Sequence, residues 1–171
     1  MKTIVIGFSR SKSPWKIGSK IIQEVEKRDF SHAYIRYSCS ITGVEVVSQA
    51  SHGYVNEVSF EIFKEQNVIV EEYEMSLTRE QFKSMLTFIQ ENKGRGYSQI
   101  QILLIGIKKI LHIELDQYEN RDMAYICSEF GARIMQVLGE KMPEHLDFLT
   151  PSNFREVIIN LKSVKLIYYS L

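Results

Sequence analysis

The order of strand-forming and helix-forming segments is the feature that most constrains the fold of this chain. Strand patterns dominate the first half: a β-branched apolar run at residues 3–8, two alternating segments at 32–39 and 44–50 around a turn at 41–43, and further strands at 55–63 and 67–73. Most of the helical patterns follow them. This separation predicts an α+β fold in which an antiparallel sheet packs against helices.

The helix signals are clearest where the chain also carries caps. Thr78 and Gln81 have the spacing of a capping box and predict a helix that ends near residue 92. Gly139 predicts the end of a helix over residues 127–138. Apolar periodicity and flanking breakers predict further helices at 15–27, 97–111 and 154–160, with a last strand at 164–169. Residues 9–14 predict a turn.

The composition is that of one ordinary globular domain spanning residues 1–171, with 44% hydrophobic and 25% charged residues. Basic and acidic residues number 21 each, so nothing favours a nucleic-acid partner. No signal peptide is evident, and the apolar stretch at 100–107 is far shorter than the roughly 20 residues of a membrane span. We therefore expect a soluble, cytoplasmic protein without an integral membrane segment. Two isolated cysteines fit a reducing compartment.

Cys127 is the candidate nucleophile. A reactive thiol needs a lowered pKa, a base and donors for an oxyanion, and a helix N-terminus supplies the first and the third. The pattern places Cys127 at the start of a helix whose apolar face packs on the sheet, where Gly131 would let a strand approach closely. Two alternatives remain open. Cys127 is simply a buried small hydrophobe, or a helix capped by Asp122 holds it in the second turn, where these effects weaken.

His32 opens a predicted strand and is the candidate base, although a histidine at that position can equally be structural. His52, His112 and His145 form no metal-ligand spacing, so no metal is expected. Cys39 is the weaker nucleophile candidate. It ends a strand, has no helix terminus to acidify it, and by alternation faces away from His32.

Four short motifs occur in a fixed order along the chain: Phe30-Ser31-His32-Ala33-Tyr34-Ile35, Val46-Val47-Ser48-Gln49-Ala50, Tyr125-Ile126-Cys127-Ser128-Glu129-Phe130 and Leu149-Thr150-Pro151-Ser152-Asn153-Phe154. Together they resemble the YiiX-like family, which comprises permuted relatives of the NlpC-type cell-wall peptidases and of lecithin:retinol acyltransferase. The histidine precedes the cysteine, the reverse of the order in papain. The resemblance covers most of the chain and implies a circularly permuted papain-like fold.

The resemblance also implies roles for individual residues. Cys127 would be the nucleophile and His32 the general base. A polar residue on the neighbouring strand would orient the imidazole. Gln49 is preferred because a side-chain amide can accept a hydrogen bond from the imidazole N–H, and Ser48 and Glu45 are the alternatives. Many relatives carry Glu or His in this region, and a neutral orienter stabilises the imidazolium less than a carboxylate does.

The implied reaction is the hydrolysis of an amide or ester by a thiolate, with no cofactor, on a small-molecule, peptide or lipid-amide substrate. We expect Ser128 and Tyr125 to contact the substrate or the oxyanion. The cleft should be lined by residues 9–15, the loop after Ala50 and the segment before Cys127. An acyltransferase or thioesterase using the same pair and a catalytically inactive binding module are the alternative functions. The sequence predicts no oligomeric state.

Overall fold

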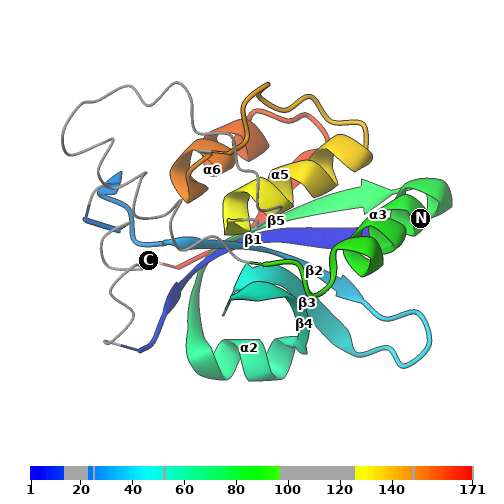
Figure 1. Ribbon diagram of the computed structural model, residues 1–171, viewed down its shortest axis with the longest axis horizontal. Coiled ribbons are helices and arrows are strands. Elements are labelled where there is room, and N and C mark those ends of the chain that lie inside the picture. Colours follow the sequence, from blue (N-terminus) through cyan, green and yellow to red (C-terminus); the bar gives the residue numbers. More distant parts are fainter. Residues whose placement is uncertain (14–22, 25, 52, 97–125, 148, 171) are drawn as a thin grey trace.

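The computed structural model describes residues 1–13, 23–24, 26–51, 53–96, 126–147 and 149–170 (Figure 1). Within these residues the chain forms an antiparallel six-stranded sheet in the order β4-β3-β2-β1-β5-β6, together with four helices. The predicted α+β class is confirmed. The strands are β1 (Lys2–Ser11), β2 (His32–Ser38), β3 (Glu45–Ser51), β4 (Tyr54–Ser59), β5 (Asn67–Leu77) and β6 (Val164–Tyr169). The helices are α2 (Phe60–Gln66), α3 (Arg79–Asn92), α5 (Cys127–Val137) and α6 (Pro151–Ile159).

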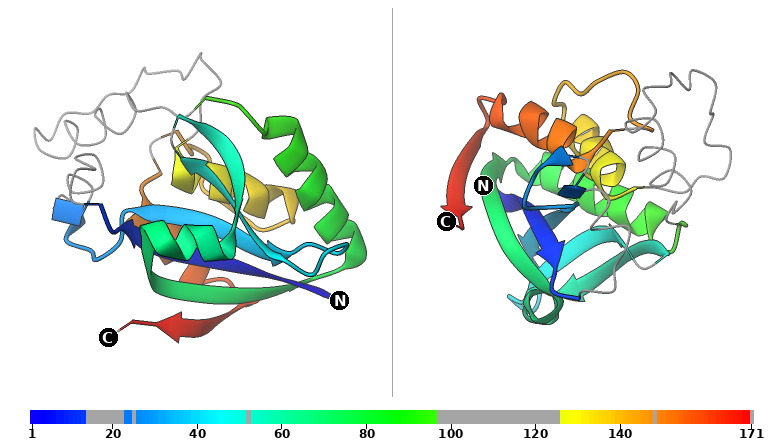
Figure 2. Two further views of the ribbon diagram at one scale, coloured as in Figure 1. Left: turned by 90° about the horizontal axis from the view of Figure 1, so that it is seen from below. Right: turned by 90° about the vertical axis from the view of Figure 1, so that its left-hand side faces the viewer.

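The helices cover the two faces of the sheet unequally. Helices α5 and α6 lie on one face with α3 beside α5, whereas α2 lies on the other face (Figures 1 and 2). The alternation of β2 follows this division as predicted. Ala33 and Ile35 belong to the main core with α5 and α6, and Tyr34 belongs to a smaller cluster with Val47 and Phe63 of α2. Strand β2 is therefore buried on both faces.

Several strand boundaries differ from the prediction, and the strand predicted at 67–73 continues to Leu77 in β5. The strand predicted at 55–63 is wrong beyond Ser59, because the Ser59 hydroxyl accepts a hydrogen bond from the Ile62 N–H at 3.4 Å and caps α2. The predicted turn at 9–14 is wrong in its first residues, because β1 continues to Ser11. After a bulge between Phe8 and Ser9 these residues still pair with β5.

The capped helices form as predicted. The Thr78 hydroxyl accepts from the Gln81 N–H at 3.1 Å, and the Gln81 side chain accepts from the Thr78 N–H at 3.0 Å, which completes a capping box at the start of α3. After α5 the chain turns at Gly139, whose φ is +90°. The last helix begins at Pro151, earlier than predicted, whereas the bounds of β6 match the prediction. The helices predicted at 15–27 and 97–111 lie wholly or mostly outside the described residues.

Adjacent buried glutamates on β5 bind arginines on opposite faces of the sheet. On the α2 side, Glu72 accepts hydrogen bonds from the Tyr34 hydroxyl at 2.7 Å and from the Arg36 guanidinium at 2.9 and 3.2 Å. On the other side, Glu71 accepts from Arg155 of α6 at 2.6 Å. Both carboxylates are buried and both arginines are partly buried, so removing an arginine would leave a buried carboxylate without its cation.

Gly7 makes the Tyr34–Glu72 contact possible. In the register of the sheet, Gly7 of β1 stands between Tyr34 of β2 and Glu72 of β5. A Cβ at Gly7 would overlap the Tyr34 ring. The missing side chain therefore lets the ring lie across β1 and place its hydroxyl on Glu72.

The substitution Gly7→Ala tests this packing. We expect it to lower the free energy of unfolding by more than about 2 kcal/mol, because the buried Tyr34 ring must move and its hydrogen bond to Glu72 breaks. The matched control is Gly43→Ala. There the backbone φ is +71° but no atom lies within 4 Å of the new Cβ, so only about 1 kcal/mol of backbone strain is added. Urea unfolding measures both, and equal losses would contradict the role given to Gly7.

Candidate thiol site

Cys127 is the first residue of α5. Ile126 before it is extended, with φ −93° and ψ 160°, and the Ile126 carbonyl accepts the first helical hydrogen bond from Phe130 at 3.0 Å. The alternative helix start at Asp122 is therefore wrong, although Asp122 itself lies outside the described residues. In this first position the Cys127 N–H has no acceptor within the helix.

The Cys127 thiol is buried, with 4% of the residue exposed. Burial raises its pKa, while hydrogen bonds from the backbone N–H groups of Ala33, Ser128 and Cys127 act in the opposite direction. The sequence predicted a pKa lowered by the helix terminus, and that prediction is wrong because desolvation outweighs the donors. At neutral pH the thiol carries its proton, so a base is needed to form the thiolate.

His32 and Gln49 are directly bonded. His32 begins β2, and its Nε2 lies 2.7 Å from Oε1 of Gln49 on β3. Gln49 is only 5% exposed. An amide oxygen only accepts hydrogen bonds, so Nε2 carries the proton and the lone pair of the neutral imidazole lies on Nδ1. The imidazole ring also lies 6.2 Å from the Phe63 ring, between centroids, on the α2 side of the sheet.

The thiol and the imidazole approach the start of β2 from opposite layers. Cys127 comes from α5, which packs on β2, and the backbone of Ala33, the residue next to His32, acts to lower the pKa of the thiol against the effect of burial. The pairing of β2 with β3 begins at Ile35 and Ser48, so His32 and Ala33 lie before the paired part of β2. The hydrogen bond to Gln49 therefore holds His32 on the α2 side of the sheet, whereas Cys127 packs with α5 on the other side, and neither feature joins the thiol to the imidazole.

The two alternative orienters lie elsewhere on β3. Ser48 is fully buried on the opposite face from Gln49, and its hydroxyl has no hydrogen-bond partner in the structure as described. Glu45 pairs with Arg36 near the other end of β3. Of the three candidates, Gln49 is the residue that reaches His32.

The neighbours of Cys127 on α5 have mainly structural contacts. The Ser128 hydroxyl, predicted to contact the substrate or the oxyanion, is buried and donates to the Leu149 carbonyl. A Cβ at Gly131 would lie 2.8 Å from the Phe154 ring of α6, so the close approach predicted for a strand is made by a helix instead. Tyr125 lies outside the described residues.

Cys39 differs from its prediction. It lies after β2, near the hairpin turn, and hydrogen bonds from the Thr42 side chain and from the backbone of Thr42 and Ile41 lower its pKa. The turn therefore supplies the acidifying contacts that a helix terminus would otherwise provide, and Cys39 competes with Cys127 for thiol reagents. His145 is exposed, whereas His52 and His112 lie outside the described residues.

Glu129 is a site residue that the sequence analysis did not single out. Its carboxylate accepts from the Ile126 N–H and lies 3.5 Å from Arg133, while its Oε2 is buried without a hydrogen bond. Burial, and then the nearby Asp147, raise the pKa of Glu129 to about 7. Ile126 has no capping side chain, and Glu129 is an acidic residue in the first turn of α5, where a carboxylate is favoured by the helix dipole. That position was the available sequence signal.

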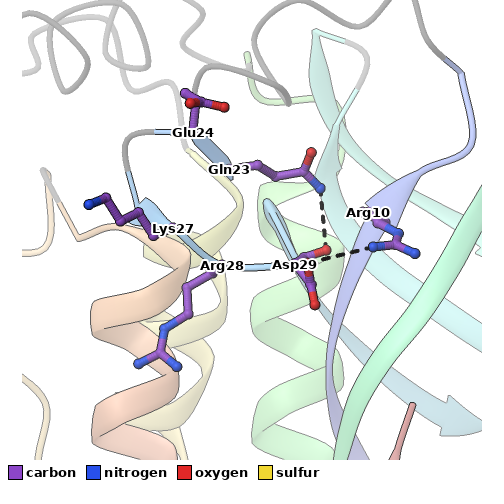
Figure 3. A pocket seen from close by; sticks show the side chains of 6 residues that line it. All are labelled: Arg10, Gln23, Glu24, Lys27, Arg28 and Asp29. Carbon is purple, nitrogen blue, oxygen red and sulfur yellow. Dashed lines mark hydrogen bonds and ion pairs between the residues drawn. The ribbon is translucent and has the colours of Figure 1, made fainter. Parts of the chain in front are cut away.

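Two surface hollows lie near this corner. One is lined by Arg10 of β1 and by residues of the segment before His32, and here Arg10 and Gln23 both point toward Asp29 (Figure 3). The other contains Gln49, residues 54–58 and Gly94. The predicted cleft segments at 9–15 and after Ala50 each contribute to one hollow, and the segment before Cys127 lies outside the described residues.

Neither a metal cluster nor a membrane span is found in the described part of the chain. No group of three or more His, Cys, Asp or Glu side chains there could hold a metal ion. Of the helices described above, none has the length and apolar character needed to cross a membrane.

These features define a class: a mixed α+β protein built on a six-stranded antiparallel sheet, with a buried cysteine at the start of a helix packed on that sheet. Among solved structures it is similar to the metalloprotein YiiX (DUF1105) of Escherichia coli O157:H7. The TM-score is 0.52 at 13% sequence identity, covering 99% of this chain and 97% of that one. The likeness shows a YiiX-like fold. No protein-family model matches the chain, and the comparison with curated proteins found no similar sequence.

The pH dependence of stability tests the environment of Glu129. Its pKa is about 7 in the folded chain against 4.5 for the free side chain, so the folded state holds the proton more tightly. Stability should fall as pH rises from 4.5 to 7, by on the order of 3 kcal/mol from this group. Glu129→Gln keeps an acceptor for the Ile126 N–H and removes the charge. The free energy of unfolding of the variant should therefore rise relative to that of the wild type as pH increases from 4.5 to 7.

Urea unfolding at several pH values measures this difference. The exposed Glu144→Gln is the matched control and should follow the wild type at every pH. A constant difference between Glu129→Gln and the wild type would contradict the burial given to this carboxyl.

Proposed function

We propose that this chain is a thiol hydrolase that cleaves an amide or ester bond, with Cys127 as the nucleophile, His32 as the base and Gln49 as the orienter of the imidazole. The observation that carries the proposal is the hydrogen bond that holds His32, the first residue of β2, to Gln49 at 2.7 Å. Cys127 begins α5, the helix that packs on the other face of the same strand. The YiiX-like fold and the order of the four motifs support the same assignment.

Each group has a defined part in the reaction. His32 Nδ1 takes the thiol proton as the sulfur attacks the carbonyl carbon, which avoids a free thiolate in a buried site. Gln49 Oε1 stabilises the imidazolium through the Nε2–H. The Cys127 N–H and a neighbouring donor hold the oxyanion. The imidazolium then protonates the leaving amine or alcohol as its bond to the carbonyl breaks, and water hydrolyses the thioester.

The similar structure is described as a metalloprotein, but among the residues that the structure describes at this corner no set fits a metal. One thiol and one imidazole are fewer than the three protein ligands usual for a catalytic zinc, and the imidazole Nε2 is already bonded to Gln49. The proposed steps therefore use no metal.

Thiol labelling tests the pair. In a Cys39→Ser background, which removes the competing thiol, an electrophilic acyl probe should label Cys127. His32→Gln should slow this labelling by about 10²- to 10⁴-fold, because the base is lost. Labelling of the urea-unfolded chains controls for intrinsic reactivity and should be equal. A labelling rate of folded Cys127 that is independent of His32 would refute the proposed chemistry.

Turnover on acylated peptides, cell-wall fragments and lipid amides tests the reaction itself. Hydrolysis that Cys127→Ser and Cys127→Ala abolish is the expected result. Acyl exchange with added amine that outpaces hydrolysis would indicate the acyltransferase alternative. Ligand binding that persists in Cys127→Ala, with no turnover in the wild type, would indicate a binding module.

Three β3 variants test the orienter. Gln49→Ala should slow Cys127 labelling by about tenfold, since the imidazolium loses its acceptor. Ser48→Ala and Glu45→Gln should leave the rate within about twofold of the wild type, because neither side chain reaches His32. Equal effects of the three substitutions would remove Gln49 from the site. All rates are measured in the Cys39→Ser background.

A further inference from the structure

A second amide stands behind Gln49. Strands β3 and β4 pair Gln49 with Asn56, and the Gln49 Nε2–H donates to Asn56 Oδ1 at 3.3 Å. Asn56 Nδ2 in turn donates to two backbone carbonyls of the turn between the strands, those of Ser51 at 3.0 Å and Tyr54 at 3.2 Å. A continuous chain of hydrogen bonds therefore connects the turn to the imidazole of His32.

This chain has only one consistent direction. Backbone carbonyls only accept, so Asn56 must turn its NH₂ group toward them and its oxygen toward Gln49. Gln49 must then turn its NH₂ group toward Asn56 and its oxygen toward His32. Rotating either amide by half a turn would place two donors or two acceptors face to face. For Gln49, which is 5% exposed, little water is available to compensate.

We propose that Asn56 is a positioning residue that sets the tautomer of His32. The carbonyls of the β3–β4 turn orient Asn56, Asn56 orients Gln49, and the Gln49 oxygen holds the His32 proton on Nε2. The lone pair then stays on Nδ1, the nitrogen that the proposed reaction uses as its base. This inference rests on the proposed function for its catalytic meaning, whereas the tautomer itself can be measured without any activity.

The place of Asn56 in the fold supports a control role. Asn56 is half-buried and lines the surface hollow that also contains Gln49, so it stands between solvent and the buried orienter. The turn that supplies the carbonyls is shaped by Gly53, whose φ is +94°. The direction of the hydrogen bonds at the site is thus set by backbone carbonyls of a hairpin, through the side-chain amides of Asn56 and Gln49.

The experiment is ¹⁵N NMR of histidine-labelled protein in a Cys127→Ser background, in which no thiolate–imidazolium pair can form. At alkaline pH the two ring ¹⁵N shifts report the tautomer, and loss of signals in a His32→Gln variant assigns them to His32. With Asn56 present, the Nε2–H form should exceed the Nδ1–H form by at least about tenfold, since the reversed amide leaves buried groups unpaired.

Two substitutions separate positioning from turn stability. Asn56→Ala removes the oxygen that orients Gln49, and the tautomer ratio should fall toward unity. Asn56→Asp keeps an oxygen facing the Gln49 NH₂ group, and the ratio should stay high. Both lose the hydrogen bonds to the Ser51 and Tyr54 carbonyls, so both should lower the melting temperature. A purely structural Asn56 would make the two variants alike in tautomer.

Cys127 labelling in the Cys39→Ser background provides the functional readout. Asn56→Ala should slow it severalfold, and Asn56→Asp should not. Where Asn56→Ala does not fold, Asn56→Val replaces it, because its β-branched side chain suits a strand and offers Gln49 no polar atom. A tautomer ratio unchanged by Asn56→Ala or Asn56→Val overturns the inference. A ratio that shifts as expected while Cys127 stays unreactive refutes the proposed function alone.

Discussion

The contact between Tyr34 and Glu72 across Gly7 is the constraint on which the rest of the structure depends. It joins β2 to β5 over the backbone of β1, and Arg36 adds its guanidinium to the same carboxylate. On the opposite face, Ala33 and Ile35 of β2 pack in the core beneath α5. Because β2 is held from both faces, its first residues have a defined position, and His32 and the N–H that meets Cys127 are among them.

The corner at the start of β2 combines a buried thiol with a polar chain of side chains. Burial raises the pKa of Cys127, so its reactivity depends on a partner rather than on the helix terminus alone. On the other face of the sheet, His32 donates a hydrogen bond to Gln49 and Gln49 donates one to Asn56, which holds these three side chains in place. Glu129 secures the start of α5 through the Ile126 N–H, and its raised pKa makes that support sensitive to pH near neutrality.

Sequence patterns succeeded where the signal is local. The capping box at Thr78, the helix beginning at Cys127 and the alternation of β2 all depend on residues within one or two turns or on one strand. The predictions were wrong where a local signal and the surrounding pattern pointed to different structures. The Ser59 cap lies inside an apolar run that resembles a strand, so α2 was missed, and β1 continued through residues that resemble a turn because β5 offered a pairing edge.

The sequence by itself determined the α+β class, because periodicity and caps are properties of neighbouring residues. The proposal of Cys127 and His32 as a pair, with Gln49 beside them, came instead from the resemblance of four short motifs to the YiiX-like family. Only the tertiary structure decided the direction of the thiol pKa values. Cys127 is desolvated by β2 and α5, whereas Cys39 receives donors from its own turn. Tertiary structure also placed Gln49, rather than Ser48 or Glu45, against His32. Strand register and the face of the sheet determine which β3 side chain contacts His32. Both depend on contacts between segments that are distant in the chain.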